Sequence, residues 1–504
     1  MANIDILLCS INAKFIHANL GLRYLRANLE DLRDRSQISE FTIEQSADEI
    51  VEIVLNSQAK IVGFGVYIWN LFETQRVVQR IKLLQPQILI VLGGPEISFE
   101  SEREPIVEWA DHILKGEADL EFKNLCHRFF NGEASPKWIA CSPPSLELLK
   151  LPYDEYSVDD LQHRLIYVEA SRGCPFQCEF CLSSLDEKVR SFDTDLFLGA
   201  MSQILAKGCR TFKFVDRTFN LKPQQAIAIM DHFKKNWVDG LFLHFEMVPD
   251  RLPESIRQEL PWFPHGALQF EIGIQSLTPE VGQRISRRMD LEKTKENFAF
   301  IRQHTKIHTH ADLIIGLPGE NLESLAQSFD LLWEMKPDEI QIGILKKLKG
   351  TPIARHSKEF NMIYNPEPPY EILANRDFCF SQMNEMKRFA RHFEIFVNGG
   401  KFPRSICQMA NSGSEGPFAI FLSFSRWVWA QTQQTHAIKF RRQIELLWEF
   451  CTEVLTLDSS TFKAILVDDL CDAKCNSEGS RKGLPNFLHS AVAYKLRKDQ
   501  GPFD

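Results

Sequence analysis

Short apolar runs that alternate with amphipathic segments are the feature that most limits the folds open to this chain. In the first 135 residues, apolar runs with the length of buried strands occur at residues 4–9, 41–44, 61–67, 88–92 and 112–115. Between them, segments such as 19–32 and 72–84 carry apolar residues at helical spacing. Strands that alternate with helices predict a parallel sheet covered by helices on both faces. We therefore expect residues 1–135 to form an α/β domain with a doubly wound, Rossmann-like sheet.

A second series of the same kind starts near residue 161. Residues 136–160 separate the two series, and their prolines and weak periodicity predict a linker. Further strand patterns follow at residues 165–170, 211–215, 241–247, 268–274, 309–315 and 339–345. They predict a partial (β/α)6 TIM-type barrel over residues 161–352, with its chemistry at the carboxyl ends of the strands. Residues 353–504 lack this rhythm and predict a mostly α-helical C-terminal domain.

The composition argues against several classes of protein. The chain has 58 Lys and Arg against 67 Asp and Glu, a net charge of −9, whereas dedicated nucleic-acid-binding proteins are usually basic. A local basic stretch at 481–498 is interpreted as a solvated tail helix. No segment reaches the roughly 18 apolar residues of a membrane span, and the start lacks the positive region of a secretion signal. We expect a cytoplasmic protein, not bound to membranes, in which clustered cysteines indicate metal binding or catalysis.

The sharpest single signal is a cysteine triplet, Cys174, Cys178 and Cys181, just after the first strand of the expected barrel. Three thiolates within eight residues of one loop can hold an iron–sulfur cluster. A four-iron cluster held by three ligands leaves one iron open for a small molecule. Structural zinc usually takes four protein ligands, and only His163 stands nearby, upstream of the loop. A cluster is the favoured interpretation, with zinc and plain thiols as the alternatives.

The spacing Cys-x-x-x-Cys-x-x-Cys after a first strand, with Phe180 before the last cysteine, resembles the radical S-adenosylmethionine (SAM) superfamily. The resemblance implies a [4Fe–4S] cluster on the three cysteines and SAM chelated through its amino and carboxylate groups at the open iron. An electron from the cluster would cleave SAM to methionine and a 5′-deoxyadenosyl radical, which abstracts a hydrogen atom from a substrate. An electron donor of flavodoxin or ferredoxin type is then an expected partner.

The same resemblance assigns candidate SAM contacts to the ends of the following strands. The candidates are Phe180, Asp216, Glu246, Gln275, Ser276 and Gly316. Asp216 stands where the superfamily has Gly-Gly-Glu, and Gly316 lies in a segment similar to the one that supports the adenine. The alternatives are a solvent-facing carboxylate for Glu246 and a plain structural turn for Gly316. His308 and His310, near the fifth strand, are interpreted as core or surface histidines rather than catalytic groups.

The first domain resembles the cobalamin-binding domain that precedes some radical SAM barrels. The candidate cobalamin contacts are Gly65, Gly93, Gly94, Pro95 and Glu96. Glycines at strand ends allow a flat corrin and its nucleotide tail to lie against the sheet. The family's first-loop Asp-x-His-x-x-Gly, which supplies a lower cobalt ligand, is absent, and His17 is interpreted as a capping or surface residue. Without this motif, the domain either binds cobalamin with no protein histidine as the lower cobalt ligand or has lost the ability to bind cobalamin.

These patterns make a cobalamin-dependent radical SAM enzyme, methylating an unactivated carbon of an unknown substrate, the leading hypothesis. A cobalamin-independent radical SAM enzyme and a non-catalytic iron–sulfur or cobalamin sensor are the alternatives. A methylthiotransferase is disfavoured because Cys9, Cys126 and Cys141 are too scattered to hold a second cluster. The C-terminal part resembles an uncharacterised domain that follows this pair in some members, and its Cys471 and Cys475 are interpreted as ordinary thiols.

Overall fold

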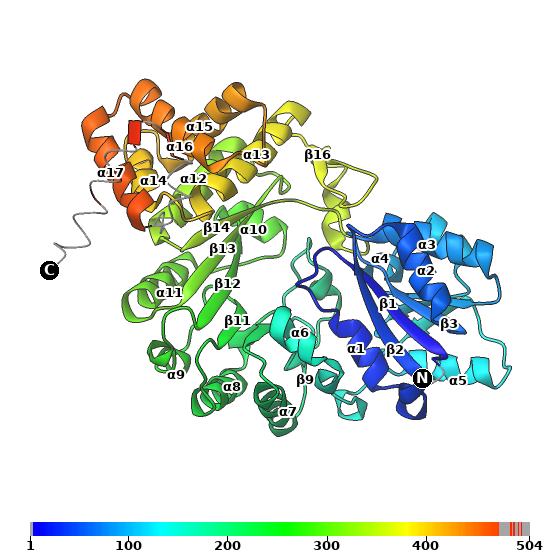
Figure 1. Cartoon of the computed structure of the whole chain (residues 1–504). Coiled ribbons are helices and arrows are strands. Elements are labelled where there is room, and N and C mark those ends of the chain that lie inside the picture. The colour runs from blue at the N-terminus through cyan, green and yellow to red at the C-terminus, as the bar shows by residue number, and fades with distance from the viewer. Residues whose placement is uncertain (1–3, 473–483, 486, 489–491, 493–494, 496–504) are drawn as a thin grey trace.

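The structure is a computed structural model that describes residues 4–472, 484–485, 487–488, 492 and 495. Cys475 and most of the basic stretch at 481–498 lie outside these residues. Figure 1 shows an N-terminal α/β unit at one end, a curved sheet in the middle and a helical C-terminal region at the other end. Across the described residues, no helix combines the length and apolar character needed to cross a membrane.

The N-terminal unit is a parallel six-stranded sheet with the strand order β2-β1-β3-β4-β5-β6. Its strands are β1 (Ile6–Asn12), β2 (Ser36–Thr42), β3 (Ile61–Gly65), β4 (Leu89–Gly93), β5 (His112–Gly116) and β6 (Trp138–Cys141). Its helices are α1 (Leu20–Ala27), α2 (Ala47–Asn56), α3 (Leu71–Leu84), α4 (Pro95–Ser98) and α5 (Glu121–Phe130). The order reverses beside β1, so the sheet is doubly wound, as expected.

The central strand β1 is mostly apolar rather than alternating in sequence, and its surroundings explain why. All seven of its residues are buried, because helices cover both faces of the sheet. Leu7, Cys9 and Ile11 join the core beneath α2 and α3. Ile6 and Leu8 point the other way and join the core beneath α1 and α5.

The stretch 136–160, predicted as a linker, contains regular structure. Strand β6 adds to the sheet edge beside β5, pairing Ile113 with Trp138, and α6 (Val158–His163) leads into the second unit. A strand of four residues between prolines gives too short a pattern to be recognised in the sequence.

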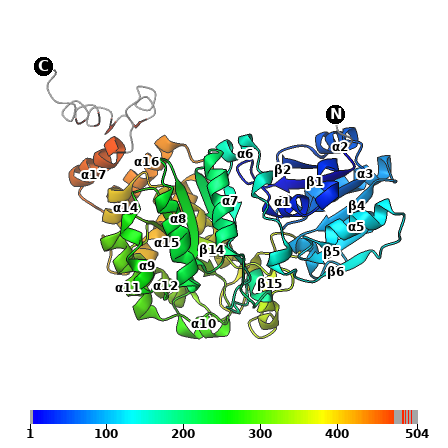
Figure 2. The same cartoon turned by 90° about the horizontal axis from the view of Figure 1, so that it is seen from below.

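The second unit is a six-stranded parallel sheet in the order β14-β13-β12-β11-β10-β7. The strands are β7 (Ile166–Val168), β10 (Thr211–Phe214), β11 (Phe242–Met247), β12 (Leu268–Gln275), β13 (His308–Ile315) and β14 (Glu339–Ile344). Its helices are α7 (Thr194–Ala206), α8 (Pro223–Lys235), α9 (Glu254–Arg257), α10 (Pro279–Arg284), α11 (Leu291–His304) and α12 (Leu322–Met335). β7 and β14 do not pair, so this is a partial barrel, with its helices on the outer face (Figure 2).

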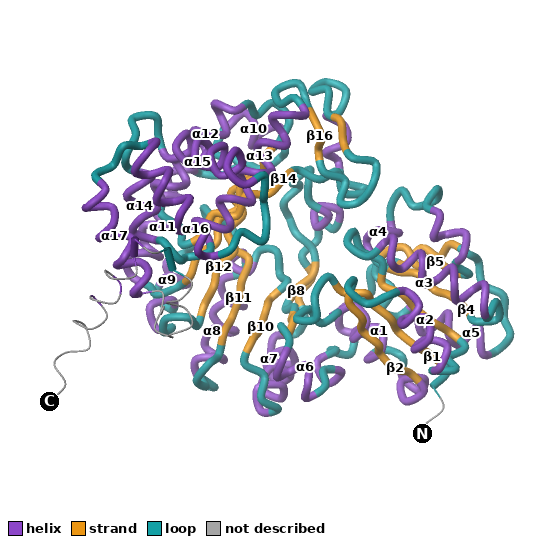
Figure 3. The backbone as a smooth tube through the Cα atoms, turned by 45° about the horizontal axis from the view of Figure 1, so that its top comes forward, coloured by secondary structure: helices purple, strands orange, loops and turns teal. Residues whose placement is uncertain are grey.

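The two faces of the barrel strands differ in character. On β13, Thr309, Ala311, Leu313 and Ile315 are buried against the helices, and the intervening residues face the lumen and are only partly buried. Figure 3 shows the strands side by side with β14 next to the C-terminal helices. A short antiparallel pair, β8 (Ser171–Arg172) with β9 (Arg190–Ser191), lies beside the first barrel strand.

The C-terminal region is mostly helical, as expected, and shares one apolar core with the barrel. Its elements are β15 (Ile363–Tyr364), β16 (Ile372–Ala374), α13 (Phe380–Phe393), α14 (Pro403–Ala410), α15 (Pro417–Thr432), α16 (Phe440–Glu449) and α17 (Ser459–Asp472). Phe329 of the barrel helix α12 contacts the rings of Phe389, Phe393, Phe418 and Phe421. Aromatic packing of this kind joins the region to the barrel as one folding unit.

A buried ionic network joins the first unit to the second. Arg23 Nη2 on α1 lies 2.8 Å from Glu40 Oε2 on β2 and 2.9 Å from Asp160 Oδ2 on α6. Arg164 Nη1, just before β7, lies 2.9 Å from the same Glu40 oxygen. The Arg23 side chain is only 2% exposed, so its charge depends on these two carboxylates.

We expect Arg23→Met to lower the free energy of unfolding by about 3–5 kcal/mol, because two buried carboxylates lose a shared cation. Urea denaturation of the full chain measures this change. As a control, Lys235→Met removes an exposed pair with Asp231 and should cost less than about 1 kcal/mol. Equal costs for the two substitutions would contradict a structural role for the network.

Candidate functional site

The three cysteines line one cavity of about 320 Å³ at the carboxyl ends of the barrel strands. Cys174 and Cys178 are buried and Cys181 is half-buried. The loop begins with Gly173, whose φ of +89° and close approach to Lys188 O leave no room for a Cβ atom. Backbone bonds from Cys174 N to Asp186 O (2.9 Å) and from Cys181 N to Cys178 O (3.1 Å) then fix the loop.

Glu179, between the second and third cysteines, anchors the loop to the chain after the barrel. Its buried carboxylate accepts hydrogen bonds from His356 Nε2 at 2.7 Å, from Ser286 Oγ at 2.9 Å and from Arg355. The Glu179 backbone oxygen also accepts a bond from Ile353 N at 2.9 Å. The side chain therefore points away from the cavity, and the thiols on either side of it are held in place.

The donor set fits an iron–sulfur cluster. No histidine or further cysteine is among the residues that line this cavity, so three thiols are the soft ligands it offers. Burial raises the pKa of the Cys174 thiol, and Arg287 acts in the opposite direction. Arg287 Nη1 also lies 3.5 Å from Cys178 Sγ, so a cation stands beside the thiols that would hold the cluster.

Three of the other residues expected to bind SAM line the same cavity: Phe180, Glu246 and Gln275. Glu246 accepts a bond from Arg217 Nη1 at 2.9 Å, and burial raises the pKa of its carboxyl group. The β12–β13 register shifts between Gly273 and Gln275, and this bulge directs the Gln275 side chain towards the cavity.

The remaining three expected SAM residues lie outside the cavity lining. Asp216 is buried behind it, where it accepts bonds from Ser171 Oγ (2.6 Å) and Ala170 N (3.0 Å), and burial raises its pKa to about 7. Ser276 donates to Glu320 Oε1 at 2.6 Å. Gly316 has φ +93° and packs against Ile372 of β16, which a Cβ would approach to 2.7 Å.

Six polar residues of the cavity were not among the site residues expected from the sequence: Arg217, Thr218, Glu271, Arg287, Asp312 and Gln341. Arg217 and Thr218 directly follow Asp216 at the same strand end, and these two residues, rather than Asp216, line the cavity. Glu271 and Asp312 occupy lumen-facing positions that strand alternation identifies once the inner face is known. Asp312 Oδ1 is buried without a partner, and burial, with Glu271 and Glu246 nearby, raises the pKa of Asp312 to about 8. Such an atom is suited to a polar group of a bound ligand.

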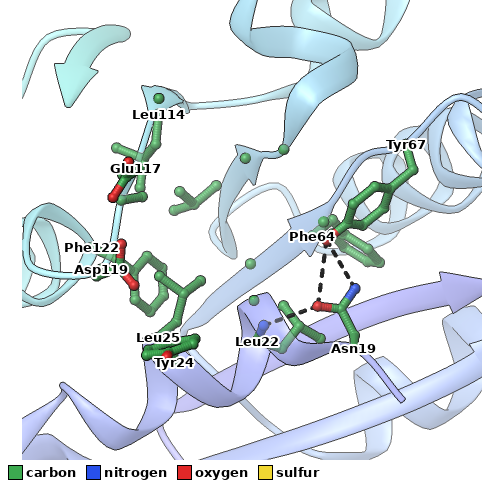
Figure 4. Close-up of a pocket in the computed structure, with 18 of the residues that line it drawn as sticks. Asn19, Leu22, Tyr24, Leu25, Phe64, Tyr67, Leu114, Glu117, Asp119 and Phe122 are labelled. Carbon is green, nitrogen blue, oxygen red and sulfur yellow. Dashed lines mark hydrogen bonds between the residues drawn. The ribbon is translucent and has the colours of Figure 1, made fainter. Parts of the chain in front are cut away.

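A second cavity, of about 210 Å³, lies in the N-terminal unit between the sheet and helices α1 and α5 (Figure 4). Its floor is made of glycines from β3, β4, the turn after β4, and β5, namely Gly63, Gly65, Gly93, Gly94 and Gly116. Leu22 and Leu25 of α1 and Phe122 of α5 form its walls. A Cβ at Gly93 would meet nothing within 4 Å, so the missing side chain creates this space. The cradle fits the flat, apolar parts of a cobalamin.

The other expected cobalamin residues have different neighbours. Gly94 has φ +111°, and a Cβ there would lie 2.5 Å from Val66 O, so the turn requires glycine. Pro95 and Glu96 lie outside the cavity lining, and Glu96 pairs with Lys349 Nζ at 2.8 Å. His17, in the loop after β1, has its Nδ1 2.7 Å from Tyr167 OH of the barrel.

Comparison with protein families identifies three consecutive domains. A B12 binding domain matches residues 7–125, the radical SAM superfamily matches 168–332, and a domain described as protein of unknown function (DUF4080) matches 358–498. The chain is therefore a radical SAM enzyme. More particularly, a B12 binding domain precedes its radical SAM domain, which confirms the resemblance inferred from its motifs. The matched domains imply a [4Fe–4S] cluster, SAM and cobalamin as cofactors.

Individual relatives are distant. The chain is 24% identical over 380 residues to an uncharacterized methyltransferase of Pyrococcus horikoshii, covering 68% of this chain and 79% of that protein. It is 21% identical over 339 residues to an anaerobic magnesium-protoporphyrin IX monomethyl ester cyclase of Rubrivivax gelatinosus, covering 60% and 59%.

Two solved structures share the fold. The radical SAM methyltransferase TsrM of Kitasatospora setae has a TM-score of 0.59 at 17% identity, over 70% of this chain and 76% of that one. The cobalamin-dependent radical enzyme OxsB has a TM-score of 0.61 at 15% identity, over 98% and 83%.

We expect Cys178→Ala to lose most of the roughly four irons per chain that a reconstituted four-iron cluster supplies, because two thiols hold a cluster poorly. The broad visible absorbance and the formation of 5′-deoxyadenosine from SAM should be lost with them. Cys209→Ala is the matched control, since Cys209 is a buried thiol outside the cavity and its loss should leave the iron content unchanged. An iron-loaded Cys178→Ala protein with unchanged turnover would refute the assignment.

We expect the buried Glu320 carboxyl to make the chain less stable as pH rises. Burial raises its pKa to about 8, so between pH 4.5 and 8 the folded state holds a proton that the unfolded state has released. The free energy of unfolding should therefore fall across this window, and Glu320→Gln should flatten the fall. Urea unfolding at pH 5, 6.5 and 8 measures the slope. The exposed Glu323→Gln is the control, and equal slopes in the two variants would contradict the prediction.

Proposed function

We propose that this chain methylates an unactivated carbon of its substrate in a cobalamin-dependent radical SAM reaction. One observation carries the proposal: Arg172 links the two cofactor cavities. Arg172 lines the glycine-floored cavity, and Cys174 of the cysteine loop is only two residues further on. Its guanidinium bonds Glu117 (2.8 Å) and Asp119 (3.0 Å) beyond β5, and Glu169 (2.8 Å) beyond β7. The ion pairs fix the position of one cavity against the other.

In the proposed enzyme, the cluster and SAM supply a 5′-deoxyadenosyl radical and cobalamin supplies a methyl group. Cys174, Cys178 and Cys181 hold the cluster, and Arg287 offsets part of the thiolate charge. Phe180, Glu246, Gln275 and Asp312 face the polar and aromatic parts of SAM. Asp216, Ser276 and Gly316 act from behind the cavity as positioning residues.

For cobalamin, we assign the direct contacts to the glycine floor. Gly65, Gly93 and Gly94 receive the flat parts of the molecule, because a surface without side chains allows close approach. Pro95 and Glu96 support this floor, since Glu96 ties the turn to Lys349 after the barrel.

A third and larger cavity, of about 1170 Å³, provides space for a substrate. It lies between the edge strand β14 and helix α13 of the C-terminal region. Phe180, Ile314, Gln341 and Gly343 line both this cavity and the cysteine cavity, so the two are neighbours with shared walls. The lining includes Lys346, Lys387, Arg388, Arg391, Glu371 and Glu394. We assign this cavity to a polar substrate, with the C-terminal region forming one wall.

The names of two relatives support methylation as the outcome, since the Pyrococcus protein and TsrM are both named methyltransferases. The enzyme also requires an external reductant, and we propose a flavodoxin or ferredoxin of the cytoplasm as the donor. The cytoplasm keeps thiols reduced, which suits the free cysteines of the cofactor loop.

The proposal is tested by anaerobic reconstitution with iron, sulfide, hydroxocobalamin and SAM labelled in its methyl group. We expect 5′-deoxyadenosine to form and the label to appear in a component of a cell extract. Deoxyadenosine without cobalamin binding would instead indicate a cobalamin-independent enzyme. An iron-loaded protein that forms no deoxyadenosine would indicate a sensor and refute the proposal.

A side chain at Gly93 should block cobalamin without disturbing the fold. The Cβ of Gly93→Val enters open space on the same strand face as Val91, which lines the cavity. We expect hydroxocobalamin affinity to fall at least about tenfold, or ~1.4 kcal/mol, measured by titration of its visible spectrum. Gly199→Val on helix α7 also enters open space and serves as the control. Unchanged binding in Gly93→Val would exclude this cavity as the cobalamin site.

A further inference from the structure

Two histidines and a glutamate meet on the lumen face of β13 and β14, at the amino ends of these strands. His308 and His310 are two residues apart on β13, so both project to the same face. Glu339 on β14 is the register partner of His310 and projects to that face as well. His308 Nε2 lies 2.9 Å and His310 Nε2 3.1 Å from Glu339 Oε1.

The donor atoms of this triad have the arrangement of a metal site. One ligand atom from each residue lies within 4.8 Å of the other two. Two imidazole nitrogens and a carboxylate oxygen are a common ligand set for zinc in sites that keep a fourth position open. The set contains no sulfur, so its chemistry differs from that of the cysteine loop.

The surroundings of the triad suit a bound ion. Asp338 Oδ2 lies 4.0 Å from His308 Nδ1, and it is held by Thr309 N (2.8 Å) and Thr309 Oγ1 (2.9 Å). At this distance Asp338 makes no hydrogen bond with His308 but adds negative charge beside the triad. His310 and Glu339 also line the 1170 Å³ cavity, so the open position of an ion would face that space.

Glu271, another carboxylate that faces the lumen, is less suited to bind a metal ion than Glu339. Glu271 lies 3.0 Å from His244 Nε2 but also 3.7 Å from Lys213 Nζ, and the ammonium group already supplies the charge that a metal would bring. Within the described residues, the ion pairs of Glu339 are with the two imidazoles alone. A divalent ion can replace their shared protons without displacing a fixed cation.

We propose that His308, His310 and Glu339 bind a divalent transition metal ion, zinc first, with one position open to the large cavity. Asp312, two residues after His310 on the same face of β13, lines the cysteine cavity, so the ion lies about 7 Å along the strand from the wall of that cavity. Its ligands are separate from the three cysteines, so it would be a second metal site beside the cluster. If the proposed function is correct, its open position holds a carboxylate or phosphate oxygen on a remote part of the substrate.

The test is metal analysis of the reconstituted full chain, dialysed anaerobically against zinc and then against metal-free buffer. We expect about one zinc per chain beside the cluster iron, with nitrogen and oxygen ligands at about 2.0–2.2 Å and no sulfur near 2.3 Å in zinc X-ray absorption. His310→Ala should lose the zinc and keep the cluster iron. A fifth iron that is lost in the same variant supports the site as well.

Two further variants separate a metal site from a simple ion pair. Glu339→Gln keeps a hydrogen-bond acceptor for the histidines but removes the carboxylate ligand, so its zinc affinity should fall at least about tenfold. This variant distinguishes a metal site from an ion pair even if His310→Ala fails to fold. His163→Ala removes an exposed histidine 3.0 Å from Asp159 and should change nothing. Less than about 0.1 zinc in the wild-type chain, zinc unaffected by either triad variant, or a sulfur shell would overturn the proposal. These results do not depend on SAM cleavage or methyl transfer, so they stand apart from the test of function.

Discussion

The charge cluster around Arg172 is the interaction on which the rest of the structure depends. Its guanidinium, 12% exposed, holds acids from the first sheet and from the barrel, and its backbone leads directly into the cysteine loop. Removing one partner from such a buried network leaves uncompensated charge, so the network stabilises this arrangement of the two units. It joins the unit with the glycine-floored cavity to the strand that leads into the cysteine loop.

The C-terminal region packs against the barrel and contacts its cysteine loop. Aromatic rings of α13 and α15 pack on α12, and His356 with Arg355 clamps Glu179 inside the cysteine motif. The loop that should carry the cluster is therefore positioned partly by residues more than 170 positions later in the chain. Loss of this region would be expected to loosen the cofactor site as well as the substrate cavity.

Much of this molecule could be predicted from its sequence, for identifiable reasons. The alternation of strand and helix patterns predicted both sheets, because fully buried strands such as β1 are mostly apolar rather than alternating. The spacing of Cys174, Cys178 and Cys181 pointed to their shared cavity. Side-chain direction at strand ends was harder: Asp216 is turned inward by Ser171, and Arg217 faces the cavity instead. The triad around Glu339 joins residues from different strands, and only the register between β13 and β14 brings them together.

The position of the cavity beside β14 affects how the substrate specificity of this protein can evolve. Its walls come mainly from the edge strand β14 and from helices of the last domain; Phe180 of the cysteine loop also lines it, but the three cysteines and the glycine floor do not. Substitutions on α13 can reshape what is accommodated there while the radical chemistry is left intact. Related chains with the same first two domains and divergent final ones would then act on different compounds, with the edge of the barrel as the place where new specificity arises.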